Sequence, residues 1–191
     1  MIFDLGELND IVKKQGLHVA VISYGGSCSN ALNSQLKKNE LKTHSPIWHS
    51  VVCHCPEFVQ FDIPTIYVYD NPKKAFLSMK KRGMAFWGTN QKKLCNDNNV
   101  SLSDENLLCS MIKQFKSWTH KKRNDVLILK SGDLFKPCIK EKLETFLNKK
   151  LKGLPLKYKK PSTSSQDKVG DHLKRLFEKY KKDIDYINNF H

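Results

Sequence analysis

Long hydrophobic runs are missing from this 191-residue sequence. A membrane-spanning helix needs roughly 18 consecutive apolar residues, and no stretch approaches that length, so we expect no membrane span. The start of the chain carries Asp4, Glu7 and Asp10 and lacks a basic stretch followed by an apolar one, so we expect no secretory signal. We therefore expect a cytoplasmic protein. With 39% hydrophobic residues, the chain can nevertheless bury a core, and its length predicts one domain over residues 1–191.

Arginine is scarce, because only positions 82, 123 and 175 carry it among 33 basic residues. The chain has 19 acidic residues and a net charge of +14, and the excess lies late: residues 1–110 carry 12 − 10 = +2 and residues 111–191 carry 21 − 9 = +12. Sequence-specific nucleic-acid recognition favours the rigid fork of Arg, so a lysine-dominated surface argues against a nucleic-acid partner. An anionic ligand or acceptor fits this charge, as does a simple solvated lysine surface.

Several motifs that would assign a chemistry are also missing. The six cysteines form no pair of C-x-x-C motifs, so we expect free thiols. Cys53-His54-Cys55 is a single C-x-C without a second spaced pair, which is poor geometry for zinc, so no metal is expected. Neither the hydrolase elbow G-x-S-x-G nor the triphosphate loop G-x-x-x-x-G-K-[ST] occurs, which argues against a serine hydrolase, a kinase or a GTPase.

What the sequence does contain is an alternation of short apolar runs with amphipathic segments. The apolar runs predict strands at 17–24, 64–70 and 125–130, with a further extended segment at 40–44. Helical spacing and capping residues predict helices at 3–15, 30–38, 72–82, from 103, 137–150 and 169–188. We expect loops at 84–102 and in the Lys-, Pro- and Ser-rich stretch 151–168. This order predicts an α/β fold with a parallel sheet flanked by helices.

In open sheets of this kind, ligands bind beyond the carboxyl ends of the strands. The first predicted strand is followed by a glycine turn that opens a helix, made of Gly25, Gly26, Ser27, Cys28, Ser29 and Asn30. Such a turn presents backbone N–H groups and the positive end of the helix dipole to an anion. The same pattern also fits a plain strand-to-helix turn, in which Cys28 is a small residue needed for close packing.

Five segments resemble, in order, motifs of the cytosolic sulfotransferases. LKTHSP is similar to the family's KTHLP, and YGGSCSNAL stands where YPKSGTTWL binds the 5′-phosphosulfate. YVYDNPKKAFLS resembles VYRNPKDVLVS, the element at the 3′-phosphate. VLILKSGDLFKP is similar to VLFLYEDLKED, and DKVGDHLKRLF is similar to KVGDWKNHF. The resemblance covers residues 17 to about 180 of a chain that is shorter than typical members.

The resemblance implies a sulfotransferase-like P-loop fold and transfer of a sulfuryl group from 3′-phosphoadenosine 5′-phosphosulfate (PAPS) to an acceptor hydroxyl or amine. It implies that His44 is the general base and that Lys42 stabilises charge on the transferring group. Without the resemblance, His44 would be taken as a capped or solvent-facing histidine at a strand end. The residues implied to bind PAPS, or its product adenosine 3′,5′-bisphosphate, are Gly25, Gly26, Ser27, Cys28, Ser29, Asn30, Ser78, Lys168 and Gly170.

The chain departs from the family at charged positions of the donor site. The loop lysine of the family is Gly26 here, the arginine at the 3′-phosphate is Asp70, and the tyrosine beneath the adenine is Ser131. Each lost charge-assisted hydrogen bond costs about 1.5–3 kcal/mol. Two hypotheses therefore stay open: a small sulfotransferase, or a non-catalytic or altered-donor relative that binds an adenine nucleotide or another phosphate ligand.

Overall fold

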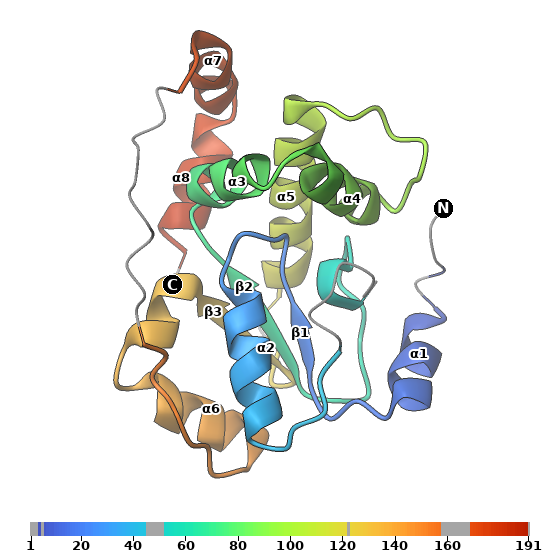
Figure 1. The fold of residues 1–191 in the computed structure, drawn as a ribbon, viewed down its shortest axis with the longest axis vertical. Coiled ribbons are helices and arrows are strands. Elements are labelled where there is room, and N and C mark those ends of the chain that lie inside the picture. Colours follow the sequence, from blue (N-terminus) through green and yellow to red (C-terminus); the bar gives the residue numbers. More distant parts are fainter. Residues whose placement is uncertain (1–3, 5, 45–51, 122, 158–168, 191) are drawn as a thin grey trace.

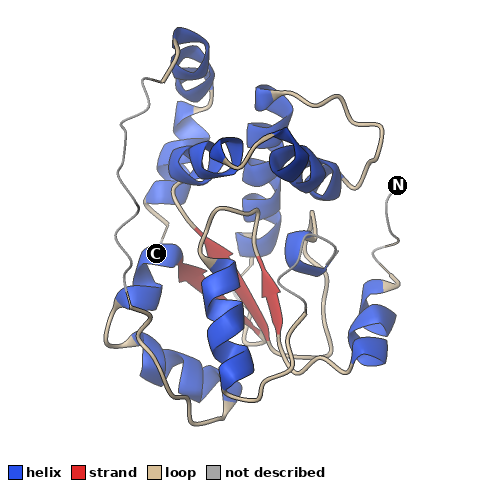
Figure 2. Cartoon of the chain, viewed as in Figure 1, coloured by secondary structure: helices blue, strands red, loops and turns tan. Residues whose placement is uncertain are grey.

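The computed structural model describes residues 4, 6–44, 52–121, 123–157 and 169–190. Its centre is a parallel sheet of three strands, β1 (Ala20–Ile22), β2 (Thr65–Tyr69) and β3 (Val126–Lys130), in the order β1-β2-β3 (Figure 2). Val21 pairs with Ile66, which in turn pairs with Leu127. The α/β class and the parallel, helix-flanked sheet are thus confirmed. The extended segment at 40–44 joins the sheet only through an isolated parallel bridge between Thr43 and Val19.

Helices cover both faces of the sheet (Figure 1). Successive β2 side chains alternate between two buried clusters, because strand side chains point alternately to the two faces. Ile66 and Val68 pack in the cluster that contains α2 (Ser29–Lys38) and α6 (Ile139–Leu147). Tyr67 and Tyr69 pack in the other cluster, with α1 (Leu8–Gln15), α3 (Pro72–Lys81), α4 (Met84–Cys95), α5 (Asp104–Thr119), α7 (Asp171–Lys179) and α8 (Lys181–Asn188). Burial on both faces explains why the strands are continuous apolar runs.

The order of the connections places a switch point at the carboxyl ends of β1 and β2. From β1 the chain passes through α2 to Thr43 on one side of β1, and then returns to β2 on the other side. The short 3-10 helix η1 (Val52–His54) lies between Thr43 and β2 in the chain. A second 3-10 helix, η2 (Ser131–Phe135), follows β3. Ligands of open α/β sheets bind where the strand order reverses in this way.

The predicted loop at 84–102 is wrong, because residues Met84–Cys95 form α4. Gly83, at φ 86°, separates α4 from α3. The buried side of α4 includes Asn90, Gln91 and Lys93 beside Trp87. Because polar residues occupy part of the buried face, the sequence shows little of the apolar spacing that predicts a helix.

Other predicted boundaries need smaller corrections. Of the predicted helix at 3–15, the described residues form α1 from Leu8, and Gly16 ends it in the left-handed conformation, as expected. The predicted helix at 169–188 is two helices, α7 and α8, with Tyr180 between them. Of the predicted loop at 151–168, residues 151–157 are described. None of the described helices has the length and apolarity that crossing a membrane requires.

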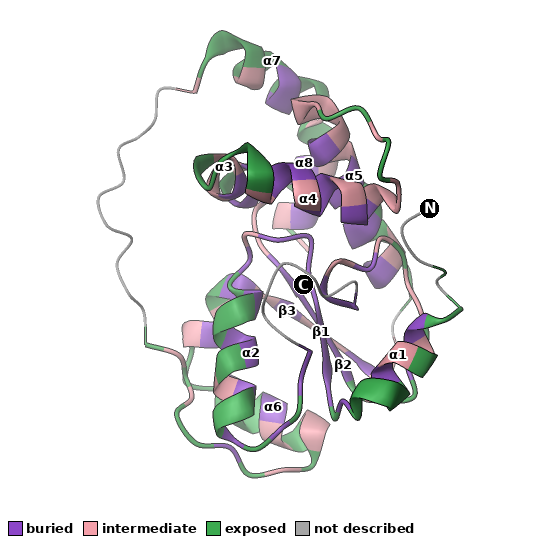
Figure 3. Cartoon of the chain, turned by 45° about the vertical axis from the view of Figure 1, so that its right-hand side comes forward, coloured by how far each residue is buried: buried purple, intermediate pink, exposed green. Residues whose placement is uncertain are grey.

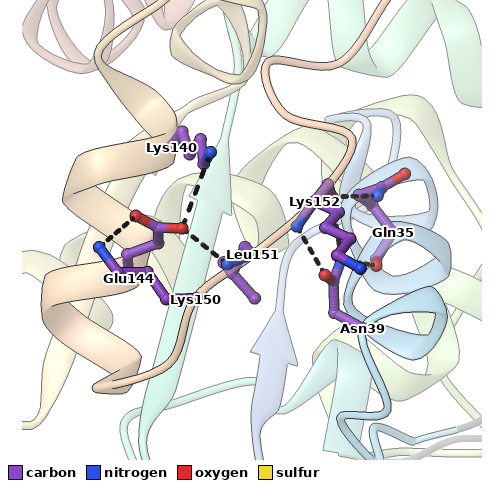
Figure 4. A network of polar contacts seen from close by, with 7 residues as sticks. All are labelled: Gln35, Asn39, Lys140, Glu144, Lys150, Leu151 and Lys152. Carbon is purple, nitrogen blue, oxygen red and sulfur yellow. Dashed lines mark hydrogen bonds and ion pairs between the residues drawn. The ribbon is translucent and has the colours of Figure 1, made fainter.

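The described start of that loop is fastened to two helices (Figure 4). Lys152 N–H donates to Asn39 Oδ1 at 2.7 Å, and its carbonyl accepts from Gln35 Nε2 at 2.6 Å, so it is held against the end of α2. Leu151 N–H donates to Glu144 Oε1 on α6 at 2.7 Å, and this bond is the main cause that lowers the pKa of Glu144. The polar contacts bridge α2 and α6 on one face of the sheet.

Candidate functional site

The turn between β1 and α2 has an unusual backbone conformation. Gly25, Gly26 and Cys28 have positive φ values of 95°, 68° and 60°. A Cβ on Gly26 would lie 2.6 Å from the backbone oxygen of Ala75, so the turn presses against α3 and only glycine fits there. Cys28 caps α2 without a side-chain hydrogen bond. Successive backbone N–H groups in a tight turn of this kind can form an anion-binding concavity.

Side chains on both flanks hold the turn in place. Ser27 Oγ donates to the carbonyl of Val68 on β2 at 3.1 Å. The hydroxyls of Ser23 and Ser29 lie 2.9 Å apart, across the mouth of the turn, and Gly25 N–H donates to Ser23 Oγ at 3.3 Å. These contacts fix the turn against the end of β2 without using the N–H groups that follow Gly25.

The backbone N–H groups of residues 26–30 have no hydrogen-bond acceptor in the part of the chain that the structure describes. The next two N–H groups, of Ala31 and Leu32, both donate to the Cys28 carbonyl. Cys28 and Asn30 are exposed, so the turn reaches solvent. Five consecutive donors at a helix start, next to the switch point of the sheet, can bind an anion.

Asp70 places a carboxylate beside this turn. Its Oδ1 accepts from Asn71 N–H at 2.6 Å and its Oδ2 accepts from the hydroxyl of Ser131, so it joins the ends of β2 and β3. Burial is the main cause that raises the pKa of the Cys28 thiol, the charge of Asp70 raises it further, and Arg82 opposes the change. The charge of Asp70 therefore reaches the turn.

His44 and Lys42 occupy different surroundings. His44 is 1% exposed, its Nε2–H donates to the carbonyl of Val21 at 2.6 Å, and its own carbonyl accepts from Asn33 Nδ2. Lys42 is exposed, and its Nζ lies 3.3 Å from where a Cβ of Gly16 would be, at the other end of β1 from the glycine turn. The structure brings His44 toward the buried edge of β1 and leaves the Lys42 ammonium away from the turn.

The remaining predicted residues are spread over the molecule. Ser78 lies on α3, one helical turn after Ala75, whose backbone meets Gly26. Gly170 precedes α7, which stands away from the β1–α2 turn in both views of the chain (Figures 1 and 3). Lys168 lies outside the described residues. The structure thus gathers residues 25–30, places Ser78 on the adjacent helix α3, and leaves Gly170 apart.

Sequence reasoning missed a second wall of the site, formed by η1 and α4. His54 Nδ1 lies 2.8 Å from the carbonyl oxygen of Ser23, and its Cε1 lies 3.7 Å from where a Cβ of Gly25 would be. Asn90 Nδ2 lies 3.1 Å from the same point. Lys93, one turn further along α4, is buried. The only sequence signal is Cys53-His54-Cys55, a pattern that suggests a metal site and not part of an anion site.

The thiol and imidazole groups of this wall are uncharged at neutral pH. Burial is the main cause that raises the pKa of the Cys53 thiol to about 11, against hydrogen bonds with Ser23 and Ser29 that lower it. Burial likewise lowers the pKa of His54 to about 4, and the charge of Lys93 adds to this effect. No group of three or more metal-ligating side chains occurs among the described residues.

Two surface hollows lie away from this turn. One is lined by residues 60–64 with Asn124, Asp125 and Phe146, and the other lies between β3 and α6. Both are open and lack a convergent set of charged groups, so the unpartnered N–H groups at residues 26–30 are the better indication of a ligand. Comparison with protein-family models finds no match, and comparisons with curated proteins and with solved structures find no significant match.

Proposed function

We propose that this protein is a sulfotransferase-like enzyme that binds the 5′-phosphosulfate of PAPS at the β1–α2 turn and transfers its sulfuryl group to an acceptor hydroxyl or amine. The observation that carries the proposal is the row of unpartnered N–H groups at residues 26–30, at the carboxyl end of β1. The ordered resemblance of five segments to the cytosolic sulfotransferases names the donor, and the sulfotransferase-like P-loop fold belongs to this proposal.

Sulfuryl transfer is an in-line displacement, so positioning and charge stabilisation supply most of the catalysis. The acceptor oxygen forms a bond to sulfur while the bond from sulfur to the phosphate oxygen breaks, and adenosine 3′,5′-bisphosphate leaves. Donors at residues 26–30 would bind the phosphate oxygens on which negative charge develops. The acceptor must also lose a proton to a base. The resemblance assigns that role to His44, whose Nε2 already donates to Val21.

A second hypothesis, an altered-donor or non-catalytic nucleotide binder, is favoured by Asp70. Its carboxylate is held by Asn71 and Ser131 where the family has an arginine for the 3′-phosphate. A fixed negative charge there disfavours a 3′-phosphate and would favour a nucleotide that carries only a 5′-phosphate chain.

Calorimetry with adenosine 3′,5′-bisphosphate and with ATP separates the two hypotheses, and labelled PAPS tests transfer to phenol, sugar and peptide acceptors. Bisphosphate binding, weakened by Asp70, together with sulfuryl transfer is the result we expect. Binding of ATP without any transfer would support the altered-donor hypothesis. Binding of neither nucleotide would overturn both.

A further inference from the structure

His54 has the orientation of a histidine that accepts protons through Nε2. Its Nδ1 faces the Ser23 carbonyl at 2.8 Å. Because a carbonyl oxygen only accepts hydrogen bonds, Nδ1 carries the proton in the neutral ring and Nε2 carries the lone pair. Fixing a histidine through one nitrogen in this way sets both its tautomer and the direction of its basic atom.

The ring also lies at the base of the anion-binding turn. Cε1, which separates the two ring nitrogens, is 3.7 Å from where a Cβ of Gly25 would be. The Ser23 that binds Nδ1 shares its hydroxyl with Ser29, the first residue of α2. His54 is half-buried, whereas His44 is 1% exposed and uses Nε2 to bind Val21. Of these two histidines, His54 is the more exposed and is the one whose ring lies next to Gly25, at the start of the turn.

The groups around His54 keep its ring neutral in the ligand-free protein. Burial is the largest cause of its lowered pKa, the Ser23 carbonyl opposes it, and Lys93 on α4 and His44 lower it further. A bound anion adds negative charge at the turn, which offsets Lys93 and raises the affinity of the ring for a proton. Substrate binding therefore moves the pKa of His54 toward the range in which a general base works best.

We propose that His54 Nε2, rather than His44, takes the proton of the acceptor hydroxyl at the β1–α2 turn. This inference rests on the proposed sulfuryl transfer. As the acceptor oxygen bonds to sulfur, its proton passes to Nε2, and the electron pair of the broken sulfur–oxygen bond stays on the bisphosphate. The imidazolium that forms remains hydrogen-bonded to Ser23 and later releases its proton to solvent.

The variant His54→Asn tests the proposal, because the Asn amide can still donate to Ser23 but has no basic nitrogen. His172→Gln is the matched control, since this exposed histidine belongs to α7. We expect His54→Asn to lower turnover with PAPS about 10²–10⁴-fold and to leave bisphosphate affinity within about twofold. We expect the control to retain both. Nitrogen NMR of the wild type should show the Nδ1–H tautomer at His54 and a rise in its pKa when the bisphosphate binds.

The possible failures are distinguishable. Turnover of His54→Asn within about threefold of an active wild type would overturn the role of His54 and leave the proposed function standing. An Nε2–H tautomer at His54 would overturn the inference whatever the activity. A wild type that binds no bisphosphate and transfers nothing would overturn the proposed function, and this inference with it.

Discussion

The hydroxyl of Tyr24 accepts a hydrogen bond of 2.8 Å from the backbone N–H of Asp70 and donates to the carbonyl of the same residue. This pair ties the chain after β1 to the chain after β2. Burial raises the pKa of Tyr24 well above its usual value, so the hydroxyl stays protonated. The link holds the glycine turn and the carboxylate of Asp70 at fixed relative positions, and the following predictions use that arrangement.

Gly26→Ala should weaken nucleotide binding at least tenfold, or about 1.4 kcal/mol. The added Cβ would lie 2.6 Å from the Ala75 oxygen, so the turn must move and its N–H groups would no longer converge. Gly132→Ala is the control, because nothing lies within 4 Å of its added Cβ. Calorimetry with adenosine 3′,5′-bisphosphate measures both. Equal affinities of the two variants would exclude residues 26–30 as the binding site.

Asp70→Asn should tighten bisphosphate binding about three- to tenfold, because it removes about 1 kcal/mol of like-charge repulsion. Asn can still accept from Asn71 N–H through Oδ1, and its Nδ2 can donate to the hydroxyl oxygen of Ser131, so the strand ends stay joined. Asp185→Asn, at an exposed position on α8, is the control and should change nothing. Unchanged affinity of Asp70→Asn would show that the ligand does not approach the end of β2.

His44→Ala should lower the free energy of unfolding by about 1–3 kcal/mol, because it leaves the buried carbonyl of Val21 without its donor. Lys42→Ala, at an exposed position, should change it by less than about 0.5 kcal/mol. Urea denaturation measures both. If His44→Ala is as stable as the wild type, its bond to Val21 contributes little, and a role of His44 in catalysis gains support.

Lys93→Met should raise the pKa of His54 toward its usual 6.5, because it removes a nearby positive charge. It should also weaken bisphosphate binding about five- to tenfold, by loss of an attractive charge. Lys92→Met is the control, because Lys92 is only half-buried, whereas Lys93 lies on the buried side of α4. NMR titration and calorimetry are the measurements. An unchanged pKa of His54 would mean that the charge of Lys93 is screened from η1.

The stability of the protein should fall as the pH drops from about 6.5 to about 4. His54 has a folded-state pKa of about 4 and an ordinary value of 6.5, so the unfolded chain binds a proton in this window that the folded chain does not. After allowance for the partial exposure of the ring, the loss is about 2 kcal/mol. Urea denaturation at several pH values gives the free energy of unfolding as a function of pH. Between pH 6.5 and about 4, this free energy should fall less steeply for His54→Asn than for the wild type. If the free energy of unfolding falls equally steeply for both proteins, other groups cause the acid sensitivity.

The strands and most helices could be predicted because their signals are local. Strand β2 is a continuous apolar run, Ser103 caps α5 by accepting from Asn106 N–H, and Gly16 ends α1. Each of these features depends on residues within a few positions of one another. The glycine turn followed by a helix was visible for the same reason, and with it the position of the candidate anion site.

The second wall of the site was decided only by tertiary structure. α4 buries polar side chains, so its sequence has the composition of a loop, and its helical state depends on packing against η1, α3 and α5. Ser23 meets His54 across 31 positions, and Asp70 meets Ser131 across 61. Hydrophobic periodicity reports which face of an element is buried but not which polar groups meet. A polar contact between distant segments depends on how the whole chain closes around the sheet.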